Sequence, residues 1–134
     1  MNQEQKPRKH YTQMSAVEVG TLVGFVRAHQ NTLIGSSHYY DRVSERSFTY
    51  EQAVNAIGAG KPIEVNKTGN DVRALFRRQS GPNAGTCAVI SLKSWDIITV
   101  YYNDPNDQHD TLNHNLYRWN VDVSRLVAQL KGGR

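Results

Sequence analysis

The chain has 134 residues, of which 38% are hydrophobic and 21% charged, a size and composition that predict one soluble globular domain. No run of about 18 apolar residues occurs and no apolar stretch follows the basic N-terminal residues, so we expect neither a membrane span nor a signal peptide. The single cysteine excludes an internal disulfide and a cysteine zinc cage, and it favours a reducing cytoplasmic location. The net charge of +4 fits a polyanionic partner and equally an inert basic surface.

The N-terminal part of the chain predicts an arm followed by a helix. Residues 1–13 carry basic side chains and almost no apolar ones, which predicts a mobile arm before a single domain over 14–134. Ser15 and Glu18 form a capping-box pattern before an apolar stripe at helical spacing. This pattern predicts a helix over about 16–30.

Two more helices are expected before the strands, and one after them. The break at "IGSS" predicts a short helix over about 36–46, and a second capping box at Thr49 predicts a helix over 50–57. Near the C-terminus, Asp122 is expected to cap a last helix that ends at Gly132.

Between these helices the hydrophobic pattern changes to a period of two, which is typical of strands. The segments with this pattern are 62–66, 71–78, 86–93 and 95–103. The tight link around Lys93 and Ser94 demands antiparallel pairing of the last two strands. We therefore predict an α+β fold, with N-terminal helices packed on a sheet of three or four antiparallel strands and a C-terminal helix.

One candidate site lies on the expected helix over 36–46. At helical spacing, His38, Arg42 and either Glu45 or Arg46 share one face. An imidazole beside guanidinium groups suits phosphodiester chemistry, because histidine transfers protons near neutral pH and arginine stabilises charge on phosphate oxygens. The alternative is a solvated helix face whose arginines pair with nearby carboxylates.

A second set of candidates lies on the strands and combines arginine, hydroxyl and tyrosine side chains. These residues are Arg73, Arg77, Arg78, Thr99, Tyr101 and Tyr102. Alternation places Thr99 and Tyr101 on one face, which is suited to holding a phosphate or stacking a base. The alternative is that threonine and tyrosine occur here because they are good strand formers.

The remaining notable side chains are interpreted as structural. Trp95, Tyr117 and Trp119 favour core or edge packing over base stacking. Cys87 heads a strand and is expected to be a buried small residue. No complete cluster of metal ligands and no glycine-rich nucleotide motif occurs, so we predict no metal and no cofactor.

Part of this pattern resembles a known family. The stretches "SHYYDRVSERSFTYEQAVNAIGAG" and "AVISLKSWDIITVYY", with an arginine-bearing strand between them, resemble a small domain widespread in bacterial toxin and mobile-element proteins. That domain is grouped with the barnase–EndoU–colicin–RelE class of ribonucleases. The similar core covers residues 37–102.

The resemblance implies metal-independent RNA cleavage, in which the 2′-hydroxyl attacks the adjacent phosphate. In this reaction His38 would be the acid–base group and Arg42 or Arg46 a phosphate contact. Arg73 or Arg77 would stabilise the transition state, with Arg78 and Tyr102 as further RNA contacts. Thr99 and Tyr101 would match the family's terminal strand motif.

Two functions are compatible with the sequence, and a structural dimerisation module built on the Gly20/Gly24 helix ranks behind both. The first is a metal-independent ribonuclease acting on RNA. The second is a non-catalytic binding module, such as a phage or mobile-element accessory protein, that binds and modulates a host protein or a nucleic acid. The position of His38 relative to Tyr101 and to Arg73 or Arg77 would distinguish them, because cleavage needs these groups in one cleft.

Overall fold

The computed structural model describes residues 7–35, 50–103 and 115–132. Its helices are α1 (Ala16–Ala28), α3 (Tyr50–Ala59) and α4 (Val123–Gly132), and its strands are β1 (Arg8–His10), β2 (Ile34–Gly35), β3 (Lys61–Thr68), β4 (Asp71–Arg77), β5 (Thr86–Ser91) and β6 (Asp96–Tyr102). The expected helix over 36–46 lies outside the described residues. No helix in the described segments is long and apolar enough to cross a membrane.

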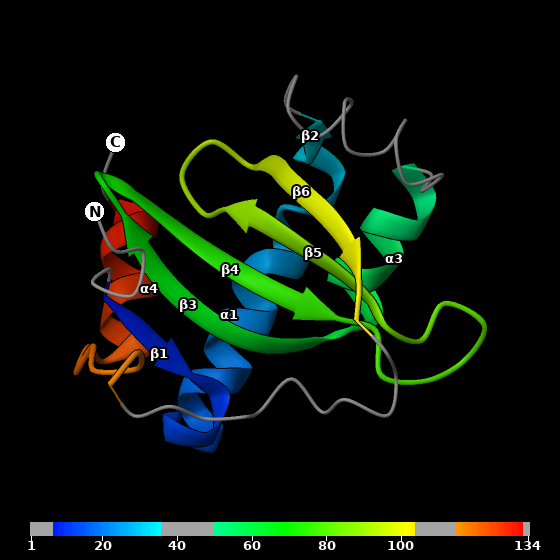
Figure 1. The fold of residues 1–134 in the computed structure, drawn as a ribbon. Helices are drawn as coiled ribbons and strands as arrows, with labels where there is room; N and C mark the ends of the chain where they lie inside the picture. Colours follow the sequence, from blue (N-terminus) through cyan, green and yellow to red (C-terminus); the bar gives the residue numbers. More distant parts are fainter. Residues whose placement is uncertain (1–6, 36–49, 104–114, 133–134) are drawn as a thin grey trace.

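The strands form one sheet in the order β1-β3-β4-β5-β6-β2 (Figure 1). Neighbouring strands from β1 to β6 pair antiparallel, and β2 pairs parallel to β6. The α+β class and the C-terminal helix are confirmed. The predicted count of three or four antiparallel strands is too low, because the described chain contributes five.

The extra antiparallel strand comes from the segment that the sequence assigned to a mobile arm. Within β1, Arg8 pairs with Asn66 of β3 and His10 pairs with Glu64. The prediction of a mobile arm is therefore wrong for Arg8–His10. Backbone pairing and polar partners far along the chain hold this strand in place. Its sequence has no aliphatic residue, so the hydrophobic pattern that predicts a strand is absent.

Helix ends follow the capping patterns in the sequence. The Ser15 hydroxyl accepts a hydrogen bond from the Glu18 backbone N–H, and the Glu18 carboxylate accepts one from the Ser15 N–H, so the capping box of α1 is complete. At the other end of the chain, the Asp122 carboxylate accepts hydrogen bonds from the backbone N–H groups of Ser124 and Arg125. The predicted caps of the first and last helices are thus confirmed.

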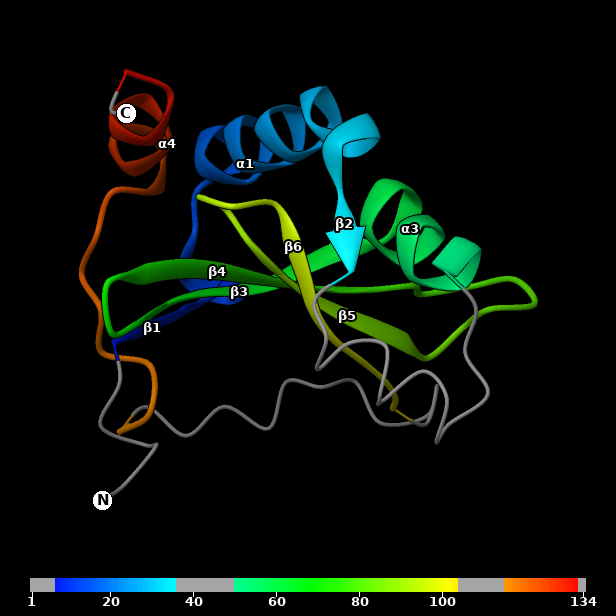
Figure 2. The same ribbon diagram turned by 90° about the horizontal axis from the view of Figure 1, so that it is seen from above.

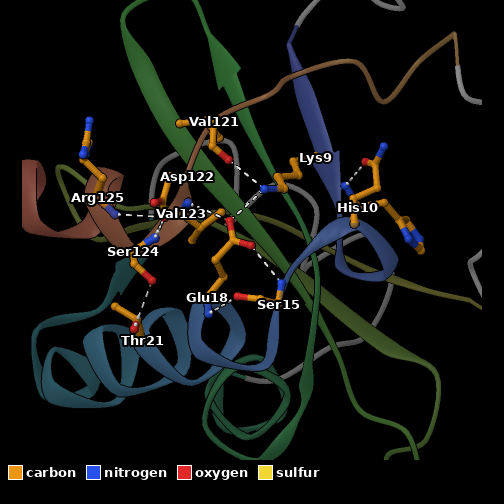
Figure 3. Close-up of polar contacts among 11 residues, drawn as sticks. Lys9, His10, Ser15, Glu18, Thr21, Val121, Asp122, Val123, Ser124 and Arg125 are labelled. Atoms are coloured by element: carbon orange, nitrogen blue, oxygen red, sulfur yellow. Dashed lines mark hydrogen bonds and ion pairs between the residues drawn. The ribbon is translucent and has the colours of Figure 1, made fainter.

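A buried ion pair between β1 and α1 also contacts the segment that leads into α4 (Figure 3). The Lys9 ammonium lies 2.7 Å from the Glu18 carboxylate and also donates to the carbonyl of Val121 at 2.7 Å. The same carboxylate accepts the backbone N–H of Val123 at 2.9 Å, in the first turn of α4. One carboxylate therefore serves the N-termini of both α1 and α4, where the helix dipoles favour negative charge.

The three helices lie on one side of the sheet (Figure 2). Apolar residues of α1, α3 and α4 and alternate residues of the strands form the main core between these layers. Its largest fully buried members are Leu22, Val26, Ile57, Val65, Phe76, Ile90, Ile97, Val100 and Val123. On the opposite side, which we call the open face, a smaller cluster is centred on Ile63, Leu75 and Cys87.

Candidate functional site

The strand half of the predicted phosphate site lies on the open face. Antiparallel register places Arg77, Cys87 and Tyr101 in one row across β4, β5 and β6. Thr99 occupies the next row, opposite Val89. Alternation in the sequence correctly placed Thr99 and Tyr101 on one face, and the register adds Arg77 to it.

Two of these side chains are packed into the protein. Arg77 is only 3% exposed, and its guanidinium donates to the Gln79 side-chain carbonyl at 2.8 Å. Burial raises the pKa of the Tyr101 phenol far above its ordinary value, and the nearby Cys87 and Glu64 add to the increase. The Tyr101 hydroxyl therefore stays protonated at neutral pH and can donate a hydrogen bond, but it is unsuited to act as a base.

The other strand candidates do not join this row. Arg73 forms an ion pair with Asp71 at 2.8 Å, which satisfies much of its charge. Arg78 donates to the backbone carbonyl of Ala59 at 3.3 Å. Tyr102 is 60% exposed and follows Tyr101, so its side chain points to the opposite side of β6.

The helix half of the predicted site lies outside the described residues. His38, Arg42 and Arg46 all fall within 36–49, so their position relative to Arg77 and Tyr101 stays a prediction. Within the described segments, no group of three or more histidine, cysteine, aspartate or glutamate side chains is arranged to hold a metal ion.

The open face also carries a polar cluster that the sequence did not indicate. Glu64 accepts two hydrogen bonds from Arg8, at 2.7 and 3.0 Å, and one from the Tyr117 hydroxyl at 3.2 Å. His10 beside it is fully buried, and its Nδ1 atom accepts the backbone N–H of Thr12 at 3.2 Å. These contacts all join residues of the chain to one another, which indicates a structural role for this cluster.

A cavity of about 750 Å³ lies on the helix-covered side of the sheet. It is bounded by α1, α4, the segment before α4, and the β3–β4 and β5–β6 turns, and we call it the α1–α4 pocket. Aromatic rings form much of its wall: Phe25, His29, Trp95 and Trp119. The His29 and Trp95 rings stack with centroids 4.1 Å apart and planes at 5°, and Phe25 meets both edge-on.

Cationic and amide groups complete this pocket. Lys67, Lys93 and Lys131 are exposed lining residues, and Asn70 and Gln129 add amide groups. Lys93 donates to the backbone carbonyl of Asn70 at 2.6 Å, which ties the two turns together. The described residues that line the pocket include no carboxylate. The pocket is therefore suited to an anion that also carries an apolar or aromatic part.

Comparisons of the chain with protein-family models, curated proteins and solved structures found no match. The ribonuclease resemblance therefore stays a prediction.

Sequence reasoning missed the α1–α4 pocket because its parts are far apart in the chain. The sequence favours packing roles for Trp95 and Trp119, and both do pack partly against the main core. The available signal was that the chain has only two tryptophans. Only the fold shows that they line the same cavity as three lysines.

Proposed function

We propose that the protein is a non-catalytic binding module for nucleic acid, with RNA as the expected class. The observation that carries this proposal is that three exposed lysines line a pocket whose described lining has no carboxylate. A lining that carries one sign of charge attracts a polyanion, and the net charge of +4 acts in the same direction. Lysine ammonium groups contact phosphates and not base edges, so binding of this kind does not depend on the nucleotide sequence.

The test is the salt dependence of RNA binding. We expect a labelled single-stranded RNA of about 12 nucleotides to bind wild-type protein more weakly as salt rises from about 50 to about 200 mM, because each phosphate contact releases condensed counterions. Joint replacement of Lys67 and Lys93 by alanine should weaken binding at low salt. It should also reduce the slope of log affinity against log salt by about 1.4, the value for two contacts to a single strand. Fluorescence anisotropy measures both quantities.

A matched control is Arg125→Ala, which removes an exposed cation of α4 that does not line the pocket. This variant should keep the wild-type slope. Absence of RNA binding by the wild type at about 50 mM salt, or equal slopes for all three proteins, would contradict the proposal.

A metal-independent ribonuclease is the second candidate, and one observation favours it. Arg77, Thr99 and Tyr101 share the open face in adjacent rows, as the strand half of such a site requires. In this candidate His38 is the acid–base group and Arg42 or Arg46 contacts the phosphate. The 2′-hydroxyl attacks the adjacent phosphorus, which yields a 2′,3′-cyclic phosphate and releases the 5′-hydroxyl of the next nucleotide.

The ribonuclease candidate predicts cleavage of labelled RNA in the presence of EDTA. His38→Ala should lower the rate by about 10²- to 10⁴-fold, the usual contribution of a general acid or base. Gel analysis should show cyclic phosphate ends for the wild type. If neither protein cleaves RNA, the binding module is the better description.

A further inference from the structure

We infer that the α1–α4 pocket takes one unpaired nucleobase from a bound strand, so that the protein selects single-stranded over double-stranded nucleic acid. This inference rests on the proposed function for contacts to the backbone. The pocket adds a binding site for a base, and this site gives the protein a preference for single-stranded nucleic acid.

The first observation is the size and wall of the pocket. A volume of about 750 Å³ lies within the range of about 300–1,000 Å³ that is typical of sites for small ligands. The wall contains flat rings, because Trp95, His29 and Trp119 all line it. Stacking on aromatic side chains is the common way in which proteins hold unpaired bases, and it works with every base.

The second observation is that two of these rings are held rigidly before any ligand arrives. Trp95 stacks on His29, and Phe25 packs edge-on against both rings at centroid distances of 5.2 and 5.0 Å. The His29 ring also contacts the Phe25 backbone carbonyl at 3.0 Å. A preorganised platform loses little conformational entropy when a ligand binds.

The third observation is the backbone of Trp95, which has a φ of +63°. It is the one non-glycine residue with positive φ among the described residues. A bulky side chain in this left-handed conformation is unfavourable, and glycine or asparagine would suit the turn better. Because strained residues cluster at binding sites, a tryptophan held in this conformation indicates that its ring is needed in the pocket.

The polar groups around the rings match the other parts of a nucleotide. Asn70 and Gln129 carry amides, each with donors and an acceptor, which can pair with the edge of a base. Lys67 near the end of β3 and Lys93 on the β5–β6 turn are exposed lining residues, and phosphates of the same strand would lie near them when its base enters. A base inside a duplex keeps its faces stacked on neighbours, so it cannot enter without unpairing.

The two tryptophans provide a direct measurement, since the chain has only two and both line the pocket. We expect single-stranded RNA to quench tryptophan fluorescence and to bind at least about tenfold more tightly than the matching duplex. A strand of the same length with abasic nucleotides should bind as weakly as the duplex and leave the fluorescence unchanged. Single-stranded DNA should behave like RNA, because stacking rings and lysine–phosphate contacts do not depend on a 2′-hydroxyl.

Variants separate a base site from simple packing. Trp95→Gly removes the ring and also relieves the backbone strain, so it should lose the preference for single strands while thermal unfolding shows a folded protein. Trp95→Phe keeps a ring and should retain most of the preference. Trp119→Leu, which leaves the strained turn untouched, should also reduce the preference.

Equal binding of single strand, duplex and abasic strand, with normal salt dependence and constant fluorescence, would overturn the base site and leave the proposed function standing. If no strand binds at low salt, the proposed function fails as well. An unchanged single-strand preference in folded Trp95→Gly and Trp119→Leu proteins would also overturn the inference.

Discussion

Replacing Glu18 by glutamine is expected to lower the free energy of unfolding by about 3 kcal/mol at neutral pH. Glu18 is 9% exposed and contacts three elements: it pairs with Lys9 of β1, accepts the Ser15 N–H in the cap of α1, and accepts the Val123 N–H of α4 (Figure 3). Glutamine has a similar size but no charge. The variant therefore leaves the Lys9 ammonium buried without its counter-ion.

The size of this effect follows from the pKa of Glu18. Burial is the largest influence and opposes ionisation, but the Lys9 hydrogen bond, the N–H groups of Val123 and Ser15 and the Lys9 charge together outweigh it. The net result lowers the pKa from 4.5 to about 2. Because the folded protein binds this proton more weakly than the unfolded chain, the stabilisation is complete above about pH 4.5 and disappears as the pH falls towards 2.

Urea unfolding at several pH values between about 2 and 7 measures this contribution. The wild type should lose more stability than Glu18→Gln between about pH 5 and 2, so the two curves converge in acid. Glu51→Gln makes the same chemical change on an exposed residue of α3 and should alter stability by no more than about 0.5 kcal/mol. Parallel curves for the wild type and Glu18→Gln would contradict the assigned role.

Local signals in the sequence predicted the elements whose ends are fixed by neighbouring residues. The capping box at Ser15 and Glu18 and the cap at Asp122 need only three or four adjacent positions, so α1 and α4 were predicted close to their observed bounds. Period-two alternation likewise predicted β4, β5 and β6 and the face shared by Thr99 and Tyr101.

Contacts between distant segments were not predictable in the same way. β1 contains no aliphatic residue, and its partners Glu18 and Glu64 lie on other elements, so nothing local distinguishes it from a mobile arm. The burial of Arg77 was also not predictable, because alternation assigns a side chain to a face of the sheet but does not tell whether other segments cover that face. The α1–α4 pocket likewise requires the turn that carries Trp95 to meet the segment that carries Trp119.

A second large effect is expected for Glu64→Leu, which should destabilise the protein by about 3 kcal/mol or more. Glu64 is 2% exposed, and its two oxygens accept hydrogen bonds from Arg8, Tyr117 and Asn66. These contacts join β1, β3 and the segment before α4. Leucine fills the space but leaves a half-buried guanidinium and a buried hydroxyl without this acceptor.

The double variant Arg8→Met/Glu64→Leu should be more stable than Glu64→Leu alone, because it removes the stranded charge together with its partner. Arg73→Met is the matched control: the Arg73–Asp71 pair is almost as short, at 2.8 Å against 2.7 Å, but both its side chains are more exposed than Glu64. Its loss should change stability by no more than about 1 kcal/mol. If the changes in unfolding free energy caused by Arg8→Met and Glu64→Leu, measured with urea, add up in the double variant, the two residues are not coupled. We expect coupling because the Glu64 carboxylate is buried, so that removal of either partner leaves the other without its ion pair.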